Sequence, residues 1–294
     1  MRRSRGTWTA AAAAAVLLGV SFYALVAWLE QGRLSDVPVY VHYADLMRGG
    51  QVPYRDFRFE YPPAALAAIL VPSYMSWSYA TSFAVLMGVC GAGCIAAAAS
   101  ALRAVAAGAV RTWAALLAIG VSPLVAGSLF DTRFDLWPAL LAVATLAAVV
   151  RERPVVSGVL LGLGFAAKLW PAVLLPIALV HLWRRRGRPG AFAAAAAFVA
   201  VSVACFLPFA ILGADGVHAM FADQLDRPLQ VESLGASILL VGEHLGGRAY
   251  LTVNSHGGQA LAGSLPASVA AVSTAIELAA IVAVWLGFAL TRRP

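Results

Sequence analysis

The sequence has few charged residues for its length. Only 12% of its 294 residues are Asp, Glu, Lys or Arg, whereas water-soluble domains hold about a quarter. Hydrophobic residues make up 61% of the chain, and the mean hydropathy is +0.81. So few polar side chains cannot cover a surface that lies entirely in water. The composition therefore excludes a water-soluble globular domain and favours a membrane protein.

Cysteine is also scarce. Cys90, Cys94 and Cys205 all lie inside apolar segments, which argues against a disulfide framework or a zinc site. Cys90 and Cys94 are one helical turn apart and are best explained as small packing residues. The histidines do not show the spacing of metal ligands. We therefore predict no cofactor, and a divalent metal held by acidic residues of the outer loops stays an open alternative.

The basic character of the chain does not indicate a nucleic-acid partner. The sequence pI is about 9.8, but the arginines lie between apolar segments rather than along one polar face. The glycine string Gly158, Gly162 and Gly164 follows no predicted strand, so it does not match a dinucleotide-binding loop. Small residues spaced four apart are better explained by close helix packing in lipid.

The apolar residues gather into long segments that suit membrane-spanning helices. A helix of about 20 residues crosses a hydrocarbon core of about 30 Å and satisfies its own backbone hydrogen bonds. We predict an all-α fold, a polytopic transmembrane helical bundle of about eight spans plus a dipping half-helix, in one integral membrane domain over residues 1–294. The predicted spans are 8–29, 76–101, 112–130, 136–150, 155–170, 171–183, 190–212 and 267–290. The first resembles a signal peptide at its start, but it is longer than a signal core, so we expect it to be retained.

Two apolar segments are too short for simple spans. Residues 63–72 form an apolar run that ends at Pro72, which predicts a half-helix dipping in from one side. Pro171 and Pro176 interrupt the pair 155–170 and 171–183. Broken helices at membrane depth are tolerated where they line a cavity or pack on protein, so we expect a cavity in the outer half of the molecule.

The charges between the spans predict an orientation. With the N-terminus in the cytoplasm, the inner segments carry thirteen arginines and one acid, a net charge of +12, whereas the outer segments carry a net charge of −4. Such an excess of arginine marks the cytoplasmic side. We therefore place residues 184–189 inside, and the long loops 30–75 and 213–266 outside, where they form the predicted active-site face.

The first outer loop holds the strongest candidates for acid–base chemistry. Asp36 follows the first span directly, and a carboxylate near the membrane surface suits a general base because partial burial raises its pKa. Asp56 and Glu60 compete with it on chemistry alone. Tyr40, Tyr43 and Glu60 are candidates for substrate binding. Tyr40 and Tyr43, together with Tyr54, also suit an aromatic belt at the interface.

The second outer turn contains Asp131 and Asp135, which are four residues apart and are predicted to share a helical face. They suit sugar hydroxyls or a structural ion pair with Arg133. Glu277 lies in the middle of the last span, where we expect a hydrogen bond to a neighbouring helix, with a proton relay as the alternative.

Lys168 is the only lysine of the chain, and it interrupts an apolar segment. A lone cation near membrane depth is costly and marks a candidate functional residue, with a phosphate as its natural partner. The alternative is a side chain that extends to the interface. In the last outer loop, Arg227 suits a phosphate, while His218, Gln230 and Glu232 suit sugar hydroxyls, and a solvated loop with local ion pairs is the alternative.

Several of these motifs together resemble a known enzyme family. The first outer loop contains Asp36-x3-Tyr40-x2-Tyr43, Gly49-Gly50-x2-Pro53-Tyr54 and Glu60-Tyr61-Pro62-Pro63, which resemble membrane glycosyltransferases of the C-type fold. The segments 167–171 and 227–233 narrow the resemblance to glycosyltransferase family 87, the polyprenol-phosphate-mannose-dependent mannosyltransferases of bacteria. The resemblance covers residues 30–240 or thereabouts.

The resemblance implies an enzyme of the bacterial plasma membrane that uses a polyprenyl-phosphate-linked sugar on the outer face. Asp36 occupies the position of the family's base on the acceptor hydroxyl, and we nominate Lys168 and Arg227 for the donor phosphate. The expected partners are this donor, a lipid or glycan acceptor of the cell envelope and membrane lipids. Family members usually have more spans after the last outer loop, which leaves open a short member, a truncated gene and an inactive relative.

Two other classes of membrane protein would have a different distribution of polar residues. A transporter or lipid-carrier flippase would concentrate polar residues near the bilayer midplane, whereas here only Glu277 is predicted to lie deep. A non-catalytic membrane scaffold would not need an isolated Lys168 or so many outer carboxylates. Both are less consistent with the polar residues than a glycosyltransferase.

Overall fold

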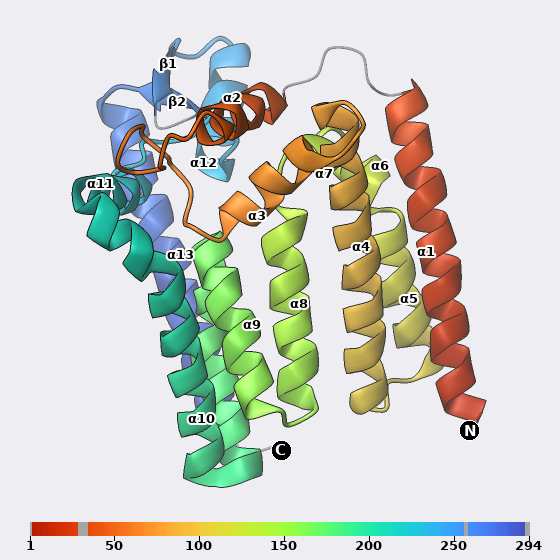
Figure 1. The fold of residues 1–294 in the computed structure, drawn as a ribbon. Coiled ribbons are helices and arrows are strands. Elements are labelled where there is room, and N and C mark those ends of the chain that lie inside the picture. The colour runs from red at the N-terminus through yellow and green to blue at the C-terminus, as the bar shows by residue number, and fades with distance from the viewer. Residues whose placement is uncertain (1, 29–34, 256–257, 292–294) are drawn as a thin grey trace. The chain divides into compact units, whose positions relative to one another are not determined.

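The computed structural model describes residues 2–28, 35–255 and 258–291 (Figure 1). The chain packs into two compact units, Met1–Val52 with Tyr61–Ile211 (unit 1) and Pro53–Glu60 with Leu212–Pro294 (unit 2). Six charged or polar residues of the predicted loops lie outside the described residues: Glu30, Gln31, Arg33, His256, Arg292 and Arg293. The prediction of one membrane domain over the whole chain stays a prediction.

Unit 1 is helical throughout its described part. Its long helices are α1 (Arg2–Trp28), α4 (Tyr79–Ala104), α5 (Ala109–Gly120), α8 (Leu136–Val150), α9 (Pro154–Ala167) and α10 (Leu175–Leu212), which ends one residue into unit 2. Short elements connect them: α2 (Val37–Arg48), α3 (Ala65–Leu70), η1 (Val71–Tyr74), α6 (Ser122–Ala126), α7 (Leu129–Thr132) and η2 (Trp170–Leu174). The predicted all-α character is confirmed, apart from one small hairpin in unit 2.

Helices α1, α4 and α5 pack around a core of alanines and larger apolar residues. Ala10, Ala14, Leu116 and Phe130 are all buried there. Glycine permits the closest approach: a Cβ at Gly120 would lie 2.9 Å from the Ala14 carbonyl oxygen. Small residues let helix backbones approach closely where the hydrophobic effect cannot drive association.

The glycine string of α9 packs against α10, as the spacing predicts. A Cβ at Gly158 would lie 2.2 Å from the Ala194 carbonyl oxygen, and a Cβ at Gly162 would lie 2.9 Å from that of Phe198. Neither position has room for a side chain, so both glycines are required by this helix contact. The interpretation as packing residues is therefore confirmed.

Helix α10 is two helices joined by a tight reversal. Gly187 has φ +71° and ψ −173°, a conformation that only glycine adopts easily. A Cβ at Gly190 would lie 3.6 Å from the carbonyl oxygen of Leu182, eight residues earlier, whereas a continuous helix would separate them by about 12 Å. The predicted division between spans 171–183 and 190–212 is thus observed, and the turn is visible in Figure 1.

The number of spans is confirmed only in part. Among the described residues, four helical segments are long and apolar enough to cross a membrane: Gly6–Ala27, Tyr79–Ala104, Trp170–Leu212 and Ser264–Leu290. Helices α5, α8 and α9 have 12, 15 and 14 residues. At 1.5 Å per residue they reach only about 18–23 Å, short of a full hydrocarbon core. The total of about eight spans stays a prediction.

The predicted half-helix is present as α3 followed by η1. The backbone N–H of Ala64 donates to the carbonyl of Ala166 (2.7 Å), and Trp137 Nε1 donates to the carbonyl of Ala64 (3.1 Å). These bonds tie the start of the short helix to α8 and α9. The segment before it was predicted only as an outer loop, and it contains helix α2.

The basic turns of unit 1 lie together at one end of its helices. The guanidinium of Arg103 lies 5.3 Å from the Trp8 ring, Arg151 donates to the Ser100 carbonyl (3.3 Å), and Arg185 donates to Glu152 (2.8 Å). These contacts join the start of α1 with the ends of α4 and α8 and the turn within α10. The clustering expected from the charge pattern is therefore observed within unit 1.

Unit 2 contains α11 (Ala214–Leu225), α12 (Leu234–His244), the antiparallel pair β1 (Leu251–Ser255) and β2 (Gly258–Ala262), and α13 (Ser264–Leu290). Leu229, Ala236 and Leu261 form its small core. Segment 53–60 belongs to it, since a Cβ at Gly216 would lie 2.0 Å from the Tyr54 carbonyl oxygen and Arg58 pairs with Asp223.

Candidate functional site

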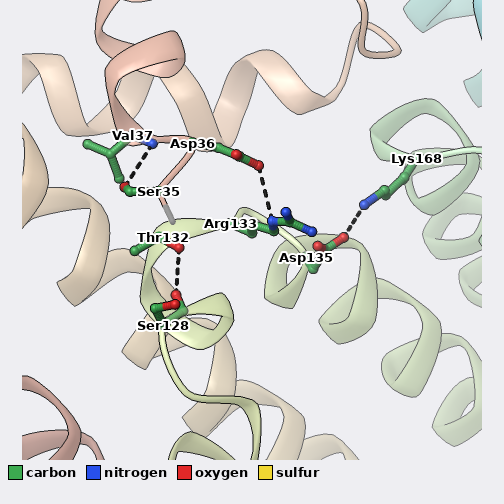
Figure 2. Close-up of polar contacts among 8 residues, drawn as sticks. All are labelled: Ser35, Asp36, Val37, Ser128, Thr132, Arg133, Asp135 and Lys168. Carbon is green, nitrogen blue, oxygen red and sulfur yellow. Dashed lines mark hydrogen bonds and ion pairs between the residues drawn. The ribbon is translucent and has the colours of Figure 1, made fainter. Parts of the chain in front are cut away.

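Two ion pairs lie close together in unit 1, and Figure 2 shows both of them. Arg133 Nε lies 3.2 Å from Asp36 Oδ2. Lys168 Nζ pairs with the carboxylate of Asp135. Helix α8 begins at Leu136, directly after Asp135. It ends about 22 Å away at the arginine-rich turn. Two acids and two bases are thereby gathered at one end of the helices, and we call these four residues the charge cluster.

Each member of the charge cluster lies where a helix begins or ends. Asp36 precedes α2, and Asp135 precedes α8. Arg133 has extended backbone (φ −123°, ψ 143°) between α7 and α8, and Lys168 has extended backbone (φ −160°, ψ 140°) after α9. The break predicted from Pro171 positions Lys168, which follows the last residue of α9.

The cluster is accessible to solvent while its pairs remain formed. The side chains of Asp36 and Arg133 are 34% and 26% exposed, and those of Lys168 and Asp135 are 38% and 47% exposed. Lys168 Nζ also lies 5.5 Å from the centre of the Phe134 ring, a cation–π contact. Lys168 was predicted to bind phosphate, and its observed partner is the carboxylate of Asp135. The phosphate contact stays a prediction.

The predicted common helical face for Asp131 and Asp135 is wrong. The chain is extended at Arg133, so Asp131 belongs to α7 whereas Asp135 precedes α8. Asp131 is buried, at 4% exposed, and Asp135 lies in the charge cluster. The spacing of four residues indicates a shared face only when one helix continues through it.

Tyrosines and a phenylalanine pack directly beside the charge cluster. Tyr40 is buried, and its ring lies 5.8 Å from Phe134 and 6.0 Å from Tyr61, centre to centre. Burial, and then the nearby carboxylates of Asp36 and Asp135, raise the pKa of the Tyr40 phenol well above its ordinary value. Tyr40 thus lies beside the charge cluster, packed against Phe134.

Two further predicted residues of the first loop have different surroundings. Tyr43 is half-buried, with its ring 6.4 Å from that of Tyr61. Glu60 belongs to unit 2, where its backbone carbonyl accepts a hydrogen bond from Gln224 Nε2 (3.4 Å). Tyr43 is thus close to the aromatic residues of the site, whereas Glu60 is described with the second unit.

The remaining predicted site residues all belong to unit 2. His218 on α11, Arg227 and Glu232 are exposed. The backbone of Gln230 pairs with that of Ala260 in β2, and its side chain donates to the Pro228 carbonyl (3.3 Å). This pairing fixes the backbone of segment 229–231 beside the hairpin, and it leaves the long side chains of Arg227 and Glu232 at the surface.

The model of glycosyltransferase family 87 matches residues 59–294, more than three quarters of the chain. The chain belongs to glycosyltransferase family 87. No curated protein and no solved structure matches the chain. The resemblance seen in the loop motifs is therefore confirmed at the level of the family, and it makes the chain a membrane glycosyltransferase.

The family 87 match includes Lys168, Asp135 and Arg133, and also Arg227 of unit 2. It begins after Asp36, so the role of Asp36 depends on its ion pair with Arg133 and on its loop motif. Arg133 was considered in the sequence only as a partner for the two acids beside it. Its position between Asp131 and Asp135 gave no indication of a contact with the first loop.

A metal site is not formed by the described residues of this family 87 chain. In that part of the chain, no three His, Cys, Asp or Glu side chains lie close enough together to hold a metal ion. The cations that the described charge cluster offers to a phosphate are therefore Arg133 and Lys168.

Proposed function

We propose that this family 87 protein transfers mannose from a polyprenyl-phosphate-linked donor to a lipid or glycan acceptor on the outer face of the bacterial plasma membrane. The observation that carries the proposal is the charge cluster. It offers a half-exposed carboxylate and two cations at one end of a membrane helix bundle. The arginine-rich turns at the other end support a cytoplasmic location for that end.

In the proposed reaction, the Asp36 carboxylate accepts the proton of the acceptor hydroxyl. The oxygen of that hydroxyl forms a bond to the anomeric carbon, and the bond from this carbon to the phosphate oxygen breaks. The lipid phosphate leaves with the electron pair, and the configuration at the anomeric carbon is inverted. A positioned carboxylate that takes the proton as the bond forms accelerates such a step by about 10²–10⁴-fold.

The leaving phosphate gains negative charge as the bond breaks, so cations near it stabilise the transition state more than the ground state. We assign Lys168 to this role. Among the predicted sugar-binding residues of unit 1, the partly exposed Tyr43 and Asp135 are assigned to sugar hydroxyls. The polyprenyl tail of the donor is expected to lie in the surrounding membrane lipid.

A donor-selectivity assay tests the proposal. Purified protein in nanodiscs is offered radiolabelled mannose linked either to polyprenyl phosphate or to a nucleoside diphosphate, with a mixed lipid extract from a bacterial envelope as acceptor. We expect transfer from the polyprenyl-linked donor alone. Transfer from the nucleotide-linked sugar would contradict the assigned donor. In a second assay, the protein is reconstituted into sealed vesicles. Movement of intact lipid-linked mannose across the vesicle bilayer without sugar transfer would favour a flippase.

A further inference from the structure

The charge cluster holds its candidate base in an ion pair before any substrate binds. Arg133 Nε lies 3.2 Å from Asp36 Oδ2, and both side chains are partly exposed. A carboxylate in such a pair is a weaker proton acceptor than a free one, since the cation favours its charged form. The observed pairing is therefore unproductive for proton transfer, and something must draw Arg133 away.

The donor phosphate is suited to that task. Arginine carries a planar set of donors that matches phosphate oxygens as well as carboxylate oxygens. Arg133 is two residues from Asp135, the observed partner of Lys168, and both Asp36 and Asp135 act on the Tyr40 phenol. An anion bound at Lys168 is thus within the same site as the Arg133 guanidinium (Figure 2).

We propose that Arg133 is a shared cation that pairs with Asp36 in the empty enzyme and with the donor phosphate when the donor binds. This inference rests on the proposed function and deepens it, because it makes donor binding release the Asp36 carboxylate. Arg133 then leaves Asp36 only when a donor is present, which favours an order of binding in which the donor precedes the acceptor. Arg133 acts as a positioning residue toward Asp36 and as a direct contact of the phosphate.

In the structure, Asp36 pairs with Arg133 and Asp135 pairs with Lys168. A phosphate must therefore compete with Asp36 for Arg133 and with Asp135 for Lys168. Competition for one cation makes two sites thermodynamically coupled, and such couplings are commonly about 5–150-fold. Removal of the Asp36 charge should consequently strengthen the binding of a lipid phosphate, although it abolishes transfer.

The test uses farnesyl phosphate, a sugar-free lipid phosphate, and the full-length protein in nanodiscs. Its dissociation constant is measured by titration calorimetry for the wild type, Asp36→Asn, Arg133→Gln and the double variant. We expect Asp36→Asn to bind about fivefold more tightly and Arg133→Gln about tenfold more weakly than the wild type. In the double variant, the gain in affinity for farnesyl phosphate that Asp36→Asn gives alone should disappear. Asparagine can still begin helix α2, so the backbone start is preserved.

Arg48→Gln is the matched control, because Arg48 is an exposed arginine in the last turn of α2 in the same unit. Its affinity for farnesyl phosphate should equal that of the wild type. Suppose that the wild type transfers mannose, but that Asp36→Asn does not bind farnesyl phosphate more tightly, or gains the same affinity with and without Arg133. Either result would overturn the shared-cation inference alone. A wild-type protein that binds no lipid phosphate and transfers no sugar would overturn the proposed function as well.

Discussion

Lys168 shows how a single side chain can be assigned from its surroundings. The sequence identifies it as an isolated cation, and the structure pairs it with Asp135 next to Phe134. A cation that binds the leaving phosphate contributes about 1.5–3 kcal/mol through a charge-assisted hydrogen bond. Lys168→Gln should therefore lower kcat/KM for the donor by about 10–150-fold. Lys168→Arg, which keeps the charge, should retain more activity, and equal losses in both variants would argue against a charge effect.

Tyr40 provides a prediction about stability against pH. Burial raises the pKa of its phenol above the ordinary value near 10, so the unfolded chain releases this proton before the folded protein does. The contribution of Tyr40 to stability is therefore complete below about pH 10 and declines as the pH rises beyond it. In detergent, the Tm should fall between about pH 9.5 and 11, and it should fall less in Tyr40→Phe. The exposed Tyr74 gives the control, since Tyr74→Phe should leave the decline unchanged.

At the scale of helices, the contact between α9 and α10 depends on a missing side chain. A Cβ at Gly158 would lie 2.2 Å from the Ala194 carbonyl oxygen, so Gly158→Ala must push the two helices apart. Overpacking of this kind costs about 1–3 kcal/mol. Gly19→Ala in α1 meets nothing within 4 Å and serves as the control. A lower Tm for Gly158→Ala alone is expected in thermal unfolding followed by fluorescence, and an unchanged Tm would refute the tight contact.

Helix breaks were predictable because proline and glycine act locally. Pro171 predicts the end of α9, and the basic segment 184–189 predicts the turn that occurs at Gly187. Helix α2 was not predicted, because its polar and aromatic residues lack a long apolar pattern. The Asp36–Arg133 pair was also not predicted. It joins elements far apart in the chain, and no local spacing encodes such a contact.

At the scale of the whole molecule, the charge pattern predicts sidedness. In a cysteine-free variant, single cysteines are placed at the exposed positions Val39, Leu225 and Arg186. A membrane-impermeant maleimide applied to intact cells should label the first two and not the third, since arginine-rich turns remain in the cytoplasm. Labelling of the third alone would reverse the orientation and place the charge cluster on the cytoplasmic side.

The central claim is that Asp36 serves as the base for sugar transfer from a lipid phosphate. The most direct measurement is the initial rate of mannose transfer from polyprenyl-phosphate-mannose by Asp36→Asn in nanodiscs. Asp45→Asn, an exposed aspartate on the same helix α2, is the control. We predict that Asp36→Asn lowers kcat by about 10²-fold or more at unchanged expression and Tm, while Asp45→Asn retains the wild-type rate. Full activity of Asp36→Asn would contradict the assignment of the base.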